Sequence, residues 1–234
     1  MNMKKRAGVI VVPGGAYNHL SQREGAPVAR AFEAMGLAAD VLKYTVRGPG
    51  DGPLGLAPVR QLARAVDGMR ERHPSLAVFV CGFSAGGHLA ATLGVHWRTL
   101  GLSRPDGLIL SYPVITAAEE LTNTETLRNI AGAGERDFFS LEKHVTPETP
   151  PAFLWHTASD ESVPVENSML FASALRRAGV PFELHIYPFG KHGLSLATGE
   201  VAQPENGRFP DAHVAGWIHE CGEWIDRMIS LSYI

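Results

Sequence analysis

The sequence predicts an α/β domain built on a parallel sheet of about six strands, with helices on both faces. Short apolar runs of about six residues alternate along the chain with longer stretches of helical periodicity, the pattern of a parallel sheet that is covered on both sides. A length of 234 residues suits one such domain with a sizeable core. Hydrophobic residues make up 45% of the chain and charged residues 19%, as in ordinary globular proteins.

Each expected strand is an apolar run that ends at a loop-forming residue. Residues 8–12 are rich in Val and Ile and stop at Pro13, whereas residues 182–187 alternate apolar with polar side chains and stop at Pro188. On these grounds we expect strands near residues 7–13, 37–43, 76–82, 107–112, 152–157 and 182–187.

The stretches between the strands have the spacing of amphipathic helices. One of them places its apolar side chains on a single helical face, namely Leu62, Ala65, Val66 and Met69. We expect helices near residues 22–35, 57–73, 85–98, 164–178 and 211–230. The chain has no internal repeat, so we expect a single domain over residues 1–234.

The pentapeptide Gly82-Phe83-Ser84-Ala85-Gly86 follows the apolar run 76–81 and precedes the helix-like run 87–93. A strand, a G-x-S-x-G and a helix in this order describe a nucleophile elbow, the tight turn that presents a reactive serine. The glycines leave room where side chains would collide with the neighbouring strand and helix. The Ser84 hydroxyl would then lie at the positive end of the helix. The alternative is a glycine-rich connection with an inert serine.

Two further loops carry the residue types that would activate such a serine. Asp160 follows the apolar run 152–155, and His192 follows the last expected strand. The chain order Ser84, Asp160, His192 is the nucleophile–acid–histidine order of α/β-hydrolases. Taken singly, Asp160 could be a helix cap or turn residue, and His192 could be a surface histidine among the ten in the chain.

Backbone donors for a developing oxyanion are expected after the first strand. The Gly14-Gly15 pair there lets N–H groups point into the space above the sheet. Acyl transfer needs such donors aimed at the oxygen that becomes negative. We expect the N–H of Gly15 or Ala16, together with that of Ala85, to form this oxyanion hole. The alternative is a plain strand-to-loop turn.

These motifs resemble the small bacterial α/β-hydrolases of the esterase/lipase superfamily, which include acetyl esterases and xylan-processing esterases. The resemblance covers nearly the whole chain. It implies Ser84 as nucleophile, Asp160 as acid and His192 as base. It also implies a trimmed sheet in the order 2-1-3-4-5-6. The runs that carry it are residues 13–17 (PGGAY), 82–89 (GFSAGGHL), 111–114 (SYPV), 151–164 (PAFLWHTASDESVP) and 190–194 (GKHGL).

Hormone-sensitive-lipase relatives carry His-Gly-Gly-Gly at the loop after the first strand. Here Pro13 replaces that histidine and Ala16 replaces the third glycine. These two differences affect the inference of which N–H groups form the oxyanion hole.

One long connection, residues 115–149, is the candidate lid insertion. It exceeds an ordinary loop in length, so we expect it to contain short helices over the site. The loop 195–210 could close the other side. The alternative for both is a solvated connector.

Composition and charge exclude several classes of function. A net charge of −3 without a long basic run gives no reason to expect nucleic acid. No stretch approaches the ~20 apolar residues of a membrane span, and the basic residues 1–6 precede an apolar run too short for a signal peptide. Cys81 and Cys221 are expected as buried free thiols, which favours a reducing, cytoplasmic compartment. No metal spacing occurs, so we expect neither metal nor cofactor.

Three functions compete at this point. The first is a serine carboxylesterase acting on short-chain, above all acetyl, esters, with acetylated sugars as candidate substrates. The second is a serine peptidase, because the stretch from His156 to Pro164 resembles the catalytic region of prolyl oligopeptidases. That family carries a large gating domain, which we do not expect here. The third is a non-catalytic binding module on the same fold. The sequence leaves homo-oligomer formation open.

Overall fold

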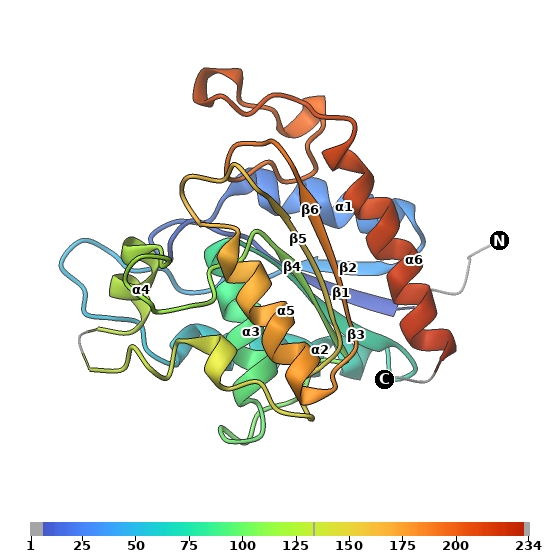
Figure 1. The fold of residues 1–234 in the computed structure, drawn as a ribbon. Helices are drawn as coiled ribbons and strands as arrows, with labels where there is room; N and C mark the ends of the chain where they lie inside the picture. The colour runs from blue at the N-terminus through green and yellow to red at the C-terminus, as the bar shows by residue number, and fades with distance from the viewer. Residues whose placement is uncertain (1–6, 133, 232–234) are drawn as a thin grey trace.

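A computed structural model describes residues 7–132 and 134–231, which fold around one six-stranded sheet (Figure 1). The sheet order is β2-β1-β3-β4-β5-β6, and all neighbouring strands are parallel, as predicted. The basic run 1–6 lies outside the described residues. The strands are β1 (Ala7–Val12), β2 (Ala38–Val41), β3 (Ala77–Phe83), β4 (Gly107–Ser111), β5 (Ala152–Thr157) and β6 (Phe182–Tyr187).

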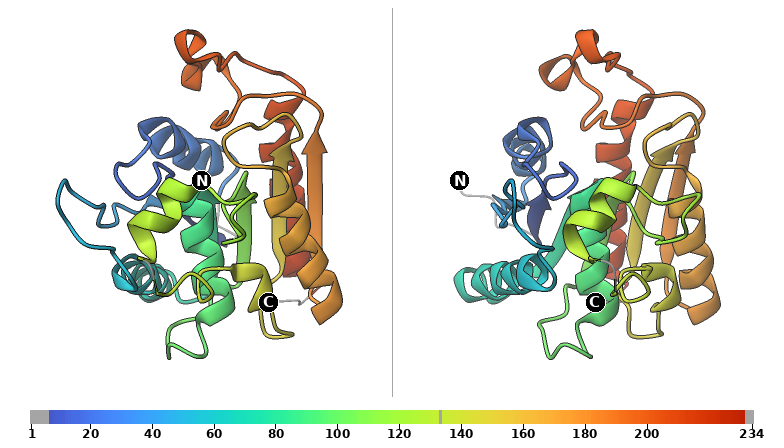
Figure 2. Two further views of the ribbon diagram at one scale, coloured as in Figure 1. Left: turned by 60° about the vertical axis from the view of Figure 1, so that its left-hand side comes forward. Right: turned by 90° about the vertical axis from the view of Figure 1, so that its left-hand side faces the viewer.

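Helices cover both faces of the sheet (Figures 1 and 2). The core on one face contains side chains of α2 (Ala57–Arg72), α3 (Ala85–His96) and α5 (Glu166–Ala178). The core on the other face contains side chains of α1 (Ala26–Ala34) and α6 (Trp217–Ser230). The central strands contribute side chains to both cores, because successive side chains of a strand point to opposite faces.

Two of the predicted helices begin later than expected. The predicted helix 22–35 is divided into a 3₁₀ turn, Gln22–Glu24, and α1. Gly25 separates them with φ −105° and ψ −104°, which is not helical. Because Pro27 lacks an N–H, it suits the first turn of α1 but could not continue the ladder of an earlier helix.

The predicted helix 211–230 is the second correction, since α6 begins only at Trp217. The Asp211 side chain accepts hydrogen bonds from the N–H groups of His213 (2.9 Å) and Val214 (3.1 Å). These bonds stabilise a local turn, and a 3₁₀ turn, Val214–Gly216, leads into the helix.

Within its described residues, 115–132 and 134–149, the candidate lid contains one short helix, α4 (Thr124–Ile130), and a 3₁₀ turn, Leu141–Lys143. Asn123 caps α4 by accepting a hydrogen bond from the Thr126 N–H at 3.0 Å. Both views of Figure 2 place α4 beside the N-terminal end of α3, where Ser84 lies. A closing role for this segment stays a prediction.

The two cysteines are free and buried, as predicted. Burial raises the pKa of the Cys81 and Cys221 thiols well above the ordinary value. Within the described ranges, no group of His, Cys, Asp and Glu side chains could hold a metal ion. No helix of residues 7–132 and 134–231 is both long and apolar enough to cross a membrane.

Candidate active site

Ser84 occupies the sharp turn between β3 and α3. Its backbone has φ 53° and ψ −118°, a conformation that a residue with a side chain rarely adopts. The turn closes because Gly82 and Gly86 have no side chain. A Cβ on Gly82 would come closer than 3.0 Å to the carbonyl oxygen of Gly86. The strain is thus built into the point where the serine is presented.

Gly86→Ala should destabilise the fold, because its Cβ would come closer than 3.0 Å to the backbone carbonyl oxygens of Val12 and Pro13. Backbone atoms of a central strand cannot move aside cheaply, so we expect a loss of roughly 1–3 kcal/mol in the free energy of unfolding. Urea denaturation measures it. The matched control is Gly68→Ala inside α2, where a Cβ meets nothing within 4 Å. This control should gain roughly 0.5–1 kcal/mol. Equal stabilities for the two variants would contradict this account of the turn.

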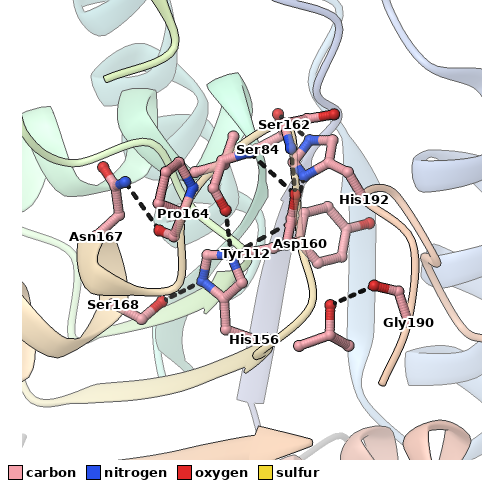
Figure 3. Close-up of polar contacts among 12 residues, drawn as sticks. Ser84, Tyr112, His156, Asp160, Ser162, Pro164, Asn167, Ser168, Gly190 and His192 are labelled. Atoms are coloured by element: carbon pink, nitrogen blue, oxygen red, sulfur yellow. Dashed lines mark hydrogen bonds and ion pairs between the residues drawn. The ribbon is translucent and has the colours of Figure 1, made fainter. Parts of the chain in front are cut away.

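The structure brings Ser84, His192 and Asp160 together in one hydrogen-bonded chain (Figure 3). The distance between the Ser84 Oγ and the His192 Nε2 is 2.9 Å, and His192 Nδ1 lies 2.6 Å from Asp160 Oδ2. The three residues follow β3, β5 and β6 and meet at the carboxyl edge of the sheet. With Nδ1–H donated to the carboxylate, Nε2 is free to accept the serine proton.

Asp160 is held as a carboxylate by several donors. Its Oδ1 accepts the N–H groups of Ser162 (2.9 Å) and Val163 (3.0 Å). Burial acts to raise the pKa of Asp160, but hydrogen bonds from His156 and His192 outweigh it and hold the pKa well below its usual range. The group is therefore ionised throughout the neutral range.

His156 is a component of the site to which the sequence analysis assigned no role of its own. Its Nε2 lies 3.0 Å from the Val163 carbonyl oxygen and 3.3 Å from Asp160 Oδ2, and its Nδ1 lies 2.8 Å from the Ser168 hydroxyl. The ring is fully buried behind the carboxylate (Figure 3). Its position directly after an apolar run was the available signal, since a buried histidine needs polar partners.

The loop after β1 has three successive residues with positive φ: Gly15 (123°), Ala16 (49°) and Tyr17 (61°). Hydrogen bonds with other segments hold it. Asn129 of α4 donates its Nδ2–H to the Ala16 carbonyl at 2.7 Å, and the Tyr17 hydroxyl lies 2.9 Å from His88 Nδ1 in the core. A strained loop of this kind persists only when its surroundings determine it strongly.

The expected oxyanion donors lie around Ser84. Within residues 7–132 and 134–231, the N–H groups of Gly15 and Ala16 have no hydrogen-bond acceptor. Ala85 is the first residue of α3, so its N–H has no acceptor inside the helix. The Gly14 N–H, in contrast, is used by Glu24 Oε2 at 2.9 Å.

An open cavity of about 500 Å³ lies over Ser84 and His192. Gly15 and Ala16 form part of its wall, as do Asn123 and Thr126 from the start of the α4 segment. Among the described residues that line it, Leu20 is the single large apolar side chain. The cavity therefore suits a polar ligand better than a long hydrocarbon chain.

A family model for the prolyl oligopeptidase family matches residues 50–222, about three quarters of the chain. The chain belongs to this family. Its fold is the α/β-hydrolase fold, shared with a solved acetyl ester-xyloside bifunctional hydrolase from Caldicellulosiruptor lactoaceticus. That structure is 37% identical, with a TM-score of 0.81, over 99% of this chain and 85% of its own.

Two curated relatives are also similar to this prolyl oligopeptidase family member. An endo-1,4-beta-xylanase B from Butyrivibrio fibrisolvens is 39% identical over 84% of the chain, and an acetylxylan esterase from Xylanibacter ruminicola is 32% identical over 81%. The matches cover 34% and 41% of those two proteins. The chain thus corresponds to less than half of either relative.

This member of the prolyl oligopeptidase family also has a buried acid, in the wall of the cavity over Ser84, that the sequence did not reveal. Glu24 is 3% exposed, and its Oε1 accepts a hydrogen bond from the Tyr112 hydroxyl at 2.8 Å. The same hydroxyl accepts the Ser195 N–H at 2.9 Å, and the Tyr112 ring packs edge-on against His192. Glu24 and Tyr112 thus connect the loop after β1, through Gly14, with the loop of His192. Burial, followed by the nearby Glu24 charge, raises the pKa of Tyr112 well above its ordinary value.

Proposed function

We propose that this chain is a serine carboxylesterase that hydrolyses short-chain esters, above all acetyl esters of carbohydrates. The observation that carries the proposal is the hydrogen-bonded chain from Ser84 through His192 to Asp160 at the wall of a polar cavity. Relatives named acetylxylan esterase and acetyl ester-xyloside hydrolase support the substrate class. The reaction needs no cofactor.

In the proposed first half-reaction, the Ser84 oxygen attacks the ester carbonyl while His192 Nε2 takes the hydroxyl proton. Asp160 holds the imidazole in the tautomer with Nδ1–H and stabilises the imidazolium that forms. His192 then gives the proton to the departing alcohol oxygen, and the acyl group stays on Ser84. Water, deprotonated by His192, attacks the acyl-enzyme and releases the acid.

The oxyanion is the second requirement of this mechanism. In our proposal the N–H of Ala85 and the N–H groups of Gly15 and Ala16 receive the negative charge. Support comes from their lack of acceptors within the described residues. Preorganised donors of this kind stabilise the tetrahedral intermediate without reorganising during the reaction.

Acetate release tests the proposal directly. The purified chain is incubated with p-nitrophenyl acetate and with acetylated xylo-oligosaccharides, and acetate is measured in both. We expect turnover of both substrates. A folded protein that releases acetate from neither would overturn the proposal and favour the non-catalytic module. Turnover of the chromogenic ester alone would retain the esterase and reject the carbohydrate.

A serine peptidase is the second candidate, and the match to the prolyl oligopeptidase family favours it. The same three side chains could cleave an amide. A prolyl peptide p-nitroanilide separates the two functions, because an esterase of this kind should release little p-nitroaniline at concentrations where it turns over p-nitrophenyl acetate rapidly.

The preferred acyl chain should be short. The cavity offers one large apolar side chain, Leu20, among its described lining residues. Each added methylene that finds apolar surface would gain about 0.8 kcal/mol, whereas added carbons that cover the polar wall displace the water bound to its polar groups and weaken binding. We therefore expect kcat/KM on p-nitrophenyl esters to peak between acetate and butyrate and to fall steeply by octanoate. A maximum at octanoate or beyond would indicate a lipase-like tunnel and rule out the acetyl preference.

Location and assembly complete the proposal. A cytoplasmic location is supported by the two buried free thiols, Cys81 and Cys221. The sequence leaves homo-oligomer formation open, and sedimentation of the purified chain would decide it.

A further inference from the structure

Two arginine side chains donate hydrogen bonds to the loop that contains His192. Arg208 donates its Nε–H to the His192 carbonyl oxygen at 2.8 Å. Arg23 donates from Nη2 to the Gly193 carbonyl oxygen at 2.8 Å and from Nη1 to that of Val201 at 3.0 Å. Both arginines also line the cavity over Ser84. Two cationic groups therefore stand beside the proposed base.

The two guanidinium groups lie next to one another. A Cβ built on Gly193 would lie 3.1 Å from Arg208 Nε and 3.4 Å from Arg23 Nη2, so both cations border the same point. In the part of the chain that the structure describes, neither arginine forms an ion pair with a carboxylate. Two neighbouring cations without a counter-ion repel each other, and an anion between them would relieve that repulsion.

Among the described residues of the cavity wall the one acid is Glu24, whose single negative charge leaves one of the two arginine charges without a counter-charge. Both oxygens of Glu24 accept hydrogen bonds, one from the Gly14 N–H and one from the Tyr112 hydroxyl. Spare donors remain on the arginines, because within residues 7–132 and 134–231 no acceptor is bound to Arg208 Nη2 or to Arg23 Nε. The wall therefore combines excess positive charge with unused N–H groups.

We propose that Arg23 and Arg208 form a subsite for a carboxylate on the alcohol part of the ester, so that acetylated acidic sugars of the uronate type are preferred substrates. Guanidinium groups match carboxylates in charge and in planar fork geometry. The alcohol part is the half that approaches these residues, because His192, whose loop they hold, protonates the leaving alcohol. The inference rests on the proposed esterase function.

A matched pair of substrates tests the subsite. One is a mono-acetylated methyl glucuronoside, and the other is the corresponding mono-acetylated methyl glucoside, which has a hydroxymethyl group in place of the carboxylate. The readout is the ratio of kcat/KM for acetate release, uronate over glucoside. For the unaltered chain we expect a ratio of about ten or more, the size of a charged hydrogen bond. A ratio of one or less overturns the subsite, whereas no acetate from either substrate would instead contradict the esterase.

Substitutions of the two arginines test whether they cause the preference for the uronate. Arg208→Gln and Arg23→Gln should each bring the ratio close to one, and Arg208→Lys should retain part of it. A substitution that loosens the His192 loop should lower kcat/KM for both substrates alike, and such a loss cancels in the ratio. The control is Arg98→Gln, since Arg98 is an exposed arginine just beyond the far end of α3 and away from the cavity. It should leave the ratio unchanged.

Salt gives a test that needs no variant. Because ions screen a half-exposed charge pair, the ratio for the unaltered chain should fall as salt rises from about 0.05 to 0.5 M. A ratio that stays high in Arg208→Gln and does not respond to salt would place the preference elsewhere and overturn the proposal.

Discussion

Ser84→Ala should lower kcat on p-nitrophenyl acetate by at least ~10³-fold, because removing the nucleophile leaves only substrate binding and the oxyanion donors. The fold should persist, since the φ of 53° is imposed by the turn and the substitution keeps a Cβ. Single-turnover assays with titrated protein measure the loss. The matched control is Ser173→Ala, an exposed serine on α5, which should keep full activity. Near-normal turnover in Ser84→Ala would end the serine-esterase assignment.

Asp160→Asn should reduce kcat by roughly 10⁴-fold at neutral pH. The N–H groups of Ser162 and Val163 would bind the amide oxygen of the new side chain. Its NH₂ would then face His192 Nδ1 and favour the tautomer that carries hydrogen on Nε2. That tautomer cannot accept the Ser84 proton, so chemistry fails although the side chain hardly changes in size.

The control for this substitution is Glu161→Gln. Glu161 is the adjacent carboxylate, its side chain is 85% exposed, and it lies 3.7 Å from Lys191 rather than against His192. We expect nearly normal kcat in Glu161→Gln. If the two variants lost activity equally, the acid would not be Asp160 alone.

Stability should also depend on Asp160 at low pH. The pKa of its carboxyl is lowered on folding, so its contribution is present above the unfolded value of about 3.9 and is lost as pH falls below it. Asp160→Asn should therefore flatten the acid limb of the stability curve, measured by urea unfolding from pH 6 down to pH 3.

Most of the strand pattern could be predicted from the sequence, because the strands are short apolar or alternating runs that end at a loop-forming residue. The parallel direction of the strands followed from the alternation of strands with helices, the strand order followed from the resemblance, and the structure confirms both. The first residues of the helices were predicted less accurately than the strands. At Gly25 and at Asp211 the outcome depends on local turns, whose hydrogen bonds compete with helix formation over one or two residues.

The same contrast holds at the site. Ser84, Asp160 and His192 each follow a strand, so a one-dimensional pattern could mark all three, and the structure places them in contact. Their catalytic roles remain proposals. No comparable sequence pattern points to Glu24 or Arg208. Arg208 binds the carbonyl oxygen of His192, which lies 16 positions earlier in the chain, across a loop that contains two 3₁₀ turns, and only the folded chain shows that contact.

The hydrogen bond from Asn129 to the Ala16 carbonyl has a consequence for engineering. Segments such as residues 115–149 are attractive units to exchange between homologous enzymes when a different specificity is wanted. Here the exchange would also remove a hydrogen bond that holds the strained loop after β1, because Asn129 belongs to α4. A chimera that lacks an amide at this position should lose turnover even on substrates that never touch the new segment, and restoring the asparagine alone should bring it back.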